Sequence, residues 1–144
     1  MRTAERNISE LDYVRLMGQI QDDLEQQDVP PCCLHRLYML LRSARRYKPE
    51  EIPQNVVTMN SDIMVRYIRS GAKKVIRIVY PAEHFLTETI QDKDADVVVY
   101  EPQALEVLGR KVNDIYFDQQ GNRTEAVVIE KVLFQPEARR LFNL

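Results

Sequence analysis

The chain has 144 residues, of which 44% are hydrophobic, and a formal net charge of −2 from 20 basic and 22 acidic side chains. These totals exclude a disordered chain and predict one ordinary domain, or one small domain with an appendage. The balanced charge argues against tight nucleic-acid binding by electrostatics alone, and the lack of a signal peptide or a membrane-length apolar run predicts a soluble, cytoplasmic protein without membrane contact.

The beginning of the chain predicts a helix. Ser9 has the side chain of a helix cap, and Asp12 falls in the first turn that would follow it. An apolar seam with helical spacing comes next, formed by Tyr13, Met17, Ile20 and Leu24. We expect this helix to end near Asp28.

A second helix is expected after Pro30 and Pro31, because proline is tolerated at the first helical position. Its apolar stripe consists of Leu34, Leu37, Leu41 and Ala44. Two amphipathic helices joined by a short loop predict an antiparallel hairpin. At 1.5 Å per residue, this hairpin reaches only about 25 Å.

After Pro53 the residue pattern changes from one typical of helices to one typical of strands. The prolines at 49 and 53 predict a linker at this point. We therefore place the domain boundary between residues 1–48 and residues 49–144. The expected strands are 56–59, 63–68, 74–80, 97–100, 115–118 and 125–134, with a short helix at 103–108. Asn60 and Ser61 are expected to form a turn or a bulge. The predicted fold class is α+β, with a helical hairpin followed by an antiparallel sheet domain.

Five short motifs carry a resemblance to a known family: residues 49–53 (PEEIP), 56–61 (VVTMNS), 79–82 (VYPA), 104–109 and 135–138. With these motifs in this order after a helical hairpin, the chain resembles the Gre-factor superfamily, which comprises the bacterial transcript-cleavage factors of RNA polymerase. It resembles in particular a branch of this superfamily that has a short arm. The hexapeptide and the Tyr-Pro-Ala are the most specific parts of the match. The helical arm is matched in type and length only.

This resemblance implies an FKBP-like sheet domain and RNA polymerase as the partner, bound at the rim of the secondary channel through the coiled coil of the β′ subunit. The implied contact residues lie between the central strand and the short helix: Val99, Tyr100, Glu101, Pro102 and Leu105. We expect Tyr100, Glu101 and Pro102 to be exposed and Leu105 to be partly buried. Glu101 stands where the family usually has serine.

Four acidic residues fall at the predicted tip of the arm: Asp22, Asp23, Glu25 and Asp28. In the cleavage factors that the chain resembles, tip carboxylates help to hold a catalytic magnesium ion in the polymerase active site. Magnesium often takes only one or two protein carboxylates, so an acidic tip can suffice. We favour a solvated acidic loop, because an arm of about 25 Å is half the length that the family uses to reach that site.

A run of basic residues without acids follows on the expected second helix, and its candidate binding face is Arg36, Arg42, Arg45 and Arg46. This face could make a weak, indirect nucleic-acid contact or touch an acidic polymerase surface. The alternative is a solvated helix face, and the sequence favours neither.

Other chemistry-bearing patterns are missing from the sequence. His35 and His84 are isolated, there is no glycine-rich phosphate loop, and the adjacent Cys32 and Cys33 have no metal-ligand spacing and are expected to be free thiols. We therefore expect no cofactor, no metal and no catalytic residue. An FKBP-type isomerase is disfavoured, because the chain has no Trp and only four Phe to line an aromatic pocket.

The leading prediction is a non-enzymatic transcription regulator that docks on RNA polymerase through its sheet domain and places a short arm at the channel mouth. The alternative is a transcript-cleavage factor that acts on backtracked complexes through the acidic tip.

Overall fold

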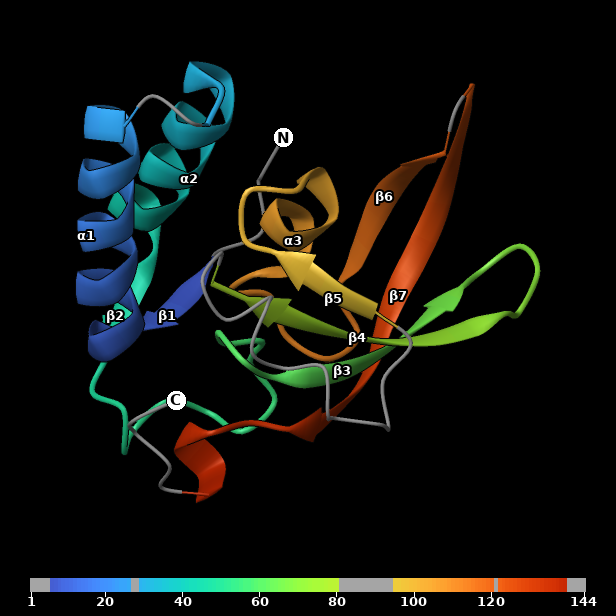
Figure 1. Ribbon diagram of the computed structural model, residues 1–144. Coiled ribbons are helices and arrows are strands. Elements are labelled where there is room, and N and C mark those ends of the chain that lie inside the picture. The colour runs from blue at the N-terminus through green and yellow to red at the C-terminus, as the bar shows by residue number, and fades with distance from the viewer. Residues whose placement is uncertain (1–5, 27–28, 81–94, 121, 140–144) are drawn as a thin grey trace.

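The computed structural model describes residues 6–26, 29–80, 95–120 and 122–139. A helical hairpin stands beside a five-stranded sheet, and a short helix, α3 (Pro102–Val107), lies between them over one face of the sheet (Figure 1). Within these ranges, no helix is long and apolar enough to cross a membrane.

The hairpin consists of α1 (Glu10–Gln26) and α2 (Pro31–Ser43). The Ser9 hydroxyl accepts a hydrogen bond from the Asp12 N–H at 3.1 Å, which confirms the predicted cap. Pro31 opens α2, also as predicted, and Leu34, Leu37 and Leu41 are buried. The apolar seam predicted for α1 is only partly confirmed. The buried residues of this helix are Asp12, Leu16 and Ile20, and of these only Ile20 belongs to the predicted seam.

A two-stranded parallel ladder closes the base of the hairpin. It pairs β1 (Asn7–Ser9) with β2 (Arg45–Tyr47). The sequence did not predict this ladder, since three-residue strands have no readable alternation. Because α2 ends at Ser43, Arg45 and Arg46 lie on a strand and not on the second helix as expected.

The sheet has the order β5-β4-β3-β7-β6. Its strands are β3 (Asp62–Tyr67), β4 (Lys73–Val79), β5 (Ala95–Val98), β6 (Ile115–Gln120) and β7 (Arg123–Phe134). Three of the four pairings are antiparallel, but β5 runs parallel to β4. The prediction of an antiparallel sheet was therefore wrong at this edge. The connection between β4 and β5 is long enough for β5 to run in the same direction as β4. A 3-10 turn, η2 (Glu137–Arg139), follows β7.

The hexapeptide at 56–61 is a buried turn and not a strand. Val56 makes a single isolated bridge to Lys111, and Asn60 has φ of 63°, the left-handed conformation that asparagine tolerates. The Ser61 hydroxyl accepts from the Thr58 N–H at 3.1 Å and lies 2.7 Å from the Thr58 hydroxyl. Backbone hydrogen bonds of Asn55 and Val57 to residues 109–112 pair the segment with the chain only around this single bridge, and the chain then turns at Asn60. The predicted turn is therefore confirmed and the predicted strand at 56–59 is wrong.

One hydrophobic core joins the hairpin to the sheet. It includes Leu16 and Leu37 from the helices, together with Ile63 and Ile76 from the sheet and Leu108 after α3. Polar links also cross between the two parts, since the Met59 N–H donates to Asp12 Oδ2 at 3.1 Å. The segments predicted as separate domains at residue 48 thus share a core.

Candidate partner-binding site

The segment that leads into α3 is a tight turn stabilised by Glu101. The Glu101 N–H donates to the Val98 carbonyl at 2.8 Å, and Glu101 Oε2 accepts from the Val98 N–H at 2.7 Å. The side chain therefore folds over its own turn while it stays exposed. Pro102 follows as the first helical residue, where its missing N–H costs nothing.

Exposure divides the five predicted contact residues into two sets. Glu101 and Pro102 are exposed as expected. Val99 and Leu105 are 0% and 2% exposed, and Tyr100 is only 8% exposed. The expectation of an exposed Tyr100 was wrong, because its ring packs into the core. A surface contact through this segment can thus involve only Glu101 and Pro102 directly.

A polar hollow of about 310 Å³ lies beside these two exposed residues. Its lining comes from β4, β5, α3 and β6: Lys74, Val97, Glu101, Pro102, Gln103, Asp118 and Gln119. Asp118 is held in place there, because Tyr67 donates its hydroxyl to Asp118 Oδ2 at 3.0 Å. The hollow places two carboxylates and one amine within reach of a partner's polar side chains.

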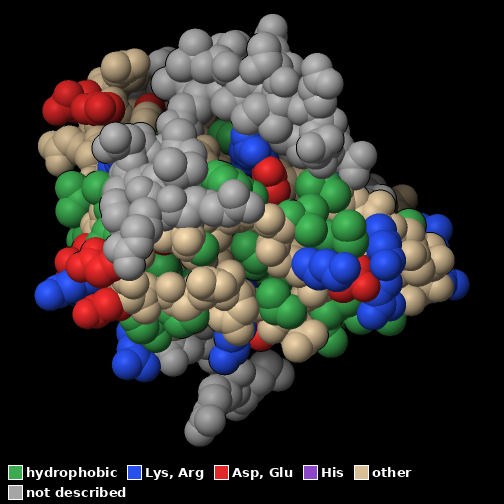
Figure 2. Space-filling view, turned by 90° about the horizontal axis from the view of Figure 1, so that it is seen from below, with side chains coloured by type: hydrophobic (Ala, Val, Ile, Leu, Met, Phe, Trp, Pro, Cys, Tyr) green, Lys and Arg blue, Asp and Glu red, His purple; other side chains and the backbone are tan. Residues whose placement is uncertain are grey.

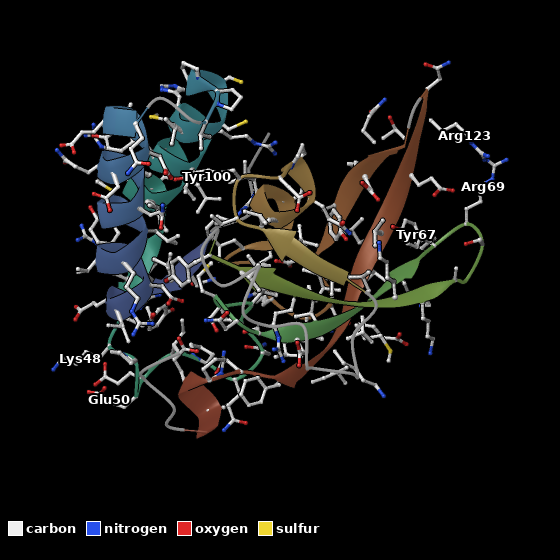
Figure 3. The ribbon with its side chains drawn as sticks, viewed as in Figure 1. Lys48, Glu50, Tyr67, Arg69, Tyr100 and Arg123 are labelled. Atoms are coloured by element: carbon white, nitrogen blue, oxygen red, sulfur yellow. The ribbon has the colours of Figure 1, made fainter. Side chains whose placement is uncertain are left out.

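Tyr100 connects the sheet to the arm, and its side chain points toward α1 (Figure 3). Its hydroxyl donates to Asp23 Oδ2, which also accepts from Gln19 Nε2 at 3.0 Å. Burial and the neighbouring Asp23 carboxylate raise the pKa of the Tyr100 hydroxyl far above its usual range, so it remains a donor at any physiological pH. Asp23 is therefore turned toward the sheet domain.

The other acidic residues of the predicted tip are not brought together by such a contact. Asp22 and Glu25 are exposed on α1, and Asp28 lies outside the described residues. Across the described parts of the chain, no group of three or more His, Cys, Asp or Glu side chains could hold a metal ion. The tip as described presents separate carboxylates and not a ligand cluster.

The residues of the predicted basic face lie on two elements, with Arg36 and Arg42 on α2 and Arg45 and Arg46 on β2. Arg36 forms an ion pair with Glu106 of α3 at 2.5 Å. The other three guanidinium groups stack on tyrosine rings, with Arg42 over Tyr38, Arg45 over Tyr47 and Arg46 over Tyr13. The sequence predicted all four arginines on one helix. That was wrong for Arg45 and Arg46, because α2 ends at Ser43.

Arg6 is a residue that the sequence did not single out, yet it joins the N-terminal segment to α3. Its Nη1 donates to the Leu105 and Leu108 carbonyls at 2.8 and 2.9 Å, where α3 ends. Burial lowers the pKa of the Arg6 guanidinium to about 10, with a contribution from the nearby Arg110. A cation at a helix C-terminus satisfies carbonyls that lack helical partners. A lone arginine before a short strand gives no signal of this role.

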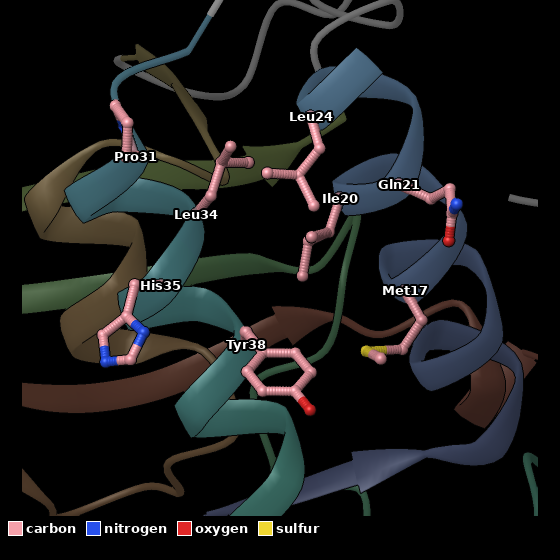
Figure 4. Close-up of a pocket in the computed structure, with 8 residues that line it drawn as sticks. All are labelled: Met17, Ile20, Gln21, Leu24, Pro31, Leu34, His35 and Tyr38. Atoms are coloured by element: carbon pink, nitrogen blue, oxygen red, sulfur yellow. The ribbon is translucent and has the colours of Figure 1, made fainter. Parts of the chain in front are cut away.

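Two apolar surface features were also not predicted. Ile115 and Phe117 are 51% and 63% exposed on β6, one of the two edge strands of the described sheet. Seen from below, the molecule shows hydrophobic side chains interspersed with charged ones (Figure 2). A hollow of about 350 Å³ opens between α1 and α2, where Ile20, Leu24 and Leu34 point toward one another (Figure 4). Leu24, expected in the core seam, is 57% exposed at this hollow.

Comparisons with known proteins place these features in context. No family model matches the sequence. The regulator of nucleoside diphosphate kinase from Escherichia coli K12 is 32% identical over 99 residues, which cover 68% of this chain and 68% of the relative. The protein of the same name from Shigella flexneri matches to the same extent.

Among solved structures, the prokaryotic transcription elongation factor GreA/GreB from Nitrosomonas europaea is similar in fold. It has a TM-score of 0.71 and 24% identity, and the match covers 92% of this chain and all of that chain. This likeness confirms the predicted α+β architecture of a hairpin followed by a sheet domain.

Proposed function

Because the chain belongs to the family of the regulator of nucleoside diphosphate kinase and shares its fold with a GreA/GreB elongation factor, we propose that it is a non-enzymatic regulator that binds RNA polymerase. Its contact is the exposed Glu101–Pro102 turn at the start of α3, beside the polar hollow. The partner surface is the β′ coiled coil at the rim of the secondary channel. An effect on a metabolic enzyme, as the relative's name indicates, would then follow from altered transcription.

The observation that carries this proposal is the position of Asp23. A cleavage factor needs its tip carboxylates free and far from the body, whereas Asp23 accepts a hydrogen bond from Tyr100, in the turn that precedes α3. The helices are also short: 17 residues for α1 and 13 for α2 correspond to about 25 and 20 Å. Both features favour a protein that occupies the channel entrance without catalysis.

Binding to purified bacterial core polymerase tests the contact. We expect the double variant Glu101→Lys and Pro102→Ala to weaken binding at least about tenfold, since it reverses a charge and removes a rigid exposed surface at the centre of the contact. Glu50→Lys is the matched control, because Glu50 is also an exposed acid and lies at the foot of the hairpin, away from α3 (Figure 3). No binding of the wild type, or equal loss with Glu50→Lys, would reject the proposed contact.

The cleavage alternative is tested separately on a backtracked elongation complex. We expect the wild-type chain to leave the RNA uncut. RNA trimming that disappears in the double variant Asp22→Asn and Asp23→Asn would establish the alternative instead.

A further inference from the structure

Cys32 and Cys33 form a pair of thiols that the proposed function does not use. They are the second and third residues of α2, and they are the only two cysteines of the chain. Cys32 is exposed and Cys33 is partly exposed. Although neighbouring side chains on a helix diverge, these two sulfur atoms lie 4.0 Å apart.

A disulfide between the two residues does not suit this helix. The Cα atoms of neighbouring residues are about 3.8 Å apart across a trans peptide, which is shorter than the roughly 4.4–6.8 Å that disulfides span. Closing the bond would also distort the first turn of α2. There the Pro30 carbonyl accepts from the N–H groups of Cys33 at 3.0 Å and Leu34 at 3.4 Å. A single atom that bridges the two sulfurs keeps them much farther apart than the roughly 2.05 Å of an S–S bond, so it requires a much smaller movement of the side chains.

The surroundings of the pair do not favour a metal cation. Zinc and similar ions normally take four ligands, and the described part of the chain offers no group of three or more His, Cys, Asp or Glu side chains. Burial and the adjacent Cys32 raise the pKa of the Cys33 thiol, so at neutral pH it keeps its proton. The site therefore suits a reagent that needs only two sulfurs and reacts with thiols that still carry their protons.

We propose that Cys32 and Cys33 are a dithiol binding site for trivalent arsenicals that carry two exchangeable hydroxyl groups. Each thiol gives its proton to one hydroxyl of R–As(OH)₂, two arsenic–oxygen bonds break, two arsenic–sulfur bonds form, and two waters leave. Arsenic stays trivalent throughout, so no oxidant or reductant takes part. The product is one ring that contains arsenic and both sulfurs, and the first turn of α2 keeps its backbone hydrogen bonds.

Phenylarsine oxide, which hydrates to the dihydroxyl form in water, tests the site on the full reduced chain. We expect intact-mass spectrometry to show one phenylarsenic group per chain with the loss of two hydrogens. The adduct should survive excess glutathione, a monothiol, and should be released by 2,3-dimercaptopropanol. Far-UV circular dichroism of the adduct should match that of the free chain.

Single variants separate ring formation from ordinary thiol reactivity. Cys32→Ser and Cys33→Ser should each lose the glutathione-resistant adduct, since a single sulfur cannot chelate. His35→Gln should keep it, because the imidazole is not a ligand in this scheme. Equal retention in either serine variant, two arsenic groups per wild-type chain, a cross-linked dimer, or a fall in helical signal on binding would each overturn the proposal.

Discussion

Single buried polar residues hold the helical hairpin to the sheet domain. Asp12 is buried at the start of α1, where its Oδ2 accepts from the Met59 N–H at 3.1 Å and its Oδ1 lies 3.4 Å from the Tyr80 hydroxyl. Glu137 is buried close by and accepts from the Thr58 hydroxyl at 2.7 Å. Burial, and secondarily the Glu137 carboxylate, raise the pKa of Asp12 to about 7.

Asp12 should make the stability of the protein depend on pH. The unfolded chain releases this proton near pH 3.8, whereas the native state holds it up to about pH 7, so the native state binds more protons between these values. The free energy of unfolding should therefore fall as the pH rises through this window and level off above it. Asp12→Asn removes the buried charge and should stabilise the chain at pH 8 by up to about 4 kcal/mol.

Urea denaturation of both proteins from pH 4 to pH 8 measures this difference. The two curves should converge at the acid end, where Asp12 is neutral like asparagine. Asp22→Asn, at an exposed position on the same helix, is the control and should follow the wild type at every pH. A variant Asp12→Asn that is less stable than the wild type at pH 8 would mean that the native carboxylate is ionised and stabilising.

Among the glycines that the structure describes, Gly109 is the one at which substitution by alanine should lower stability most. Its φ is +82°, and an added Cβ would lie 2.9 Å from the Asn7 carbonyl oxygen. Gly109→Ala should therefore cost at least about 2 kcal/mol of stability, measured by urea denaturation. Gly71→Ala has a similar φ but open space around it and should cost only about 1 kcal/mol.

Gly18 provides the opposite case within the same experiment. It lies in α1, and an added Cβ meets nothing within 4 Å. Gly18→Ala should raise stability by roughly 0.5–1 kcal/mol, because alanine loses less conformational entropy in a helix. If all three glycine variants had the same effect, the close approach of Asn7 to Gly109 would not be the cause.

At the scale of elements, the sequence predicted those with strong local signals. The cap at Ser9, the Pro31 start, the alternation of β3 and the β6–β7 hairpin are all local patterns, and the structure has them. The β1–β2 ladder and the parallel β4–β5 pairing depend on tertiary contacts between distant segments, which no local pattern encodes. The exposure of Glu101 and Pro102 could likewise be predicted from their local sequence. The hydrogen bond from Tyr100 to Asp23 could not, because it joins two distant segments of the chain.

The contact between α1 and the sheet domain should respond to the Tyr100 hydroxyl. Tyr100→Phe removes the hydrogen bond to Asp23 and keeps the buried ring. We expect a stability loss of about 1 kcal/mol, since Asp23 can turn to water, and faster amide hydrogen exchange in the last turns of α1. A double-mutant cycle with Asp23→Ala should show coupling of similar size. Unchanged exchange in α1, with no coupling, would mean that the bond does not hold the arm.

At the scale of the whole molecule, the helical arm packs against the sheet domain through one shared hydrophobic core. Arg36 pairs with Glu106, Arg6 caps α3, and Tyr100 binds Asp23, so three polar contacts join the hairpin side of the molecule to α3 or to the turn before it. In our proposal, the Glu101–Pro102 turn is the contact with polymerase. A partner held at that turn would therefore also fix the direction of the arm.

Competition with a cleavage factor is the outcome expected from this arrangement. If the chain occupies the rim of the secondary channel without catalysis, adding it to a backtracked complex should slow the RNA cleavage that a Gre factor stimulates, and more Gre factor should restore the rate. The double variant Glu101→Lys and Pro102→Ala should inhibit at least about tenfold less, in step with its weaker binding, while Glu50→Lys should inhibit like the wild type. Inhibition that more Gre factor does not relieve would place the chain at another polymerase surface. If the chain saturates the polymerase and the cleavage rate stays unchanged, the chain binds without blocking the channel. That result would reject the proposed mode of action.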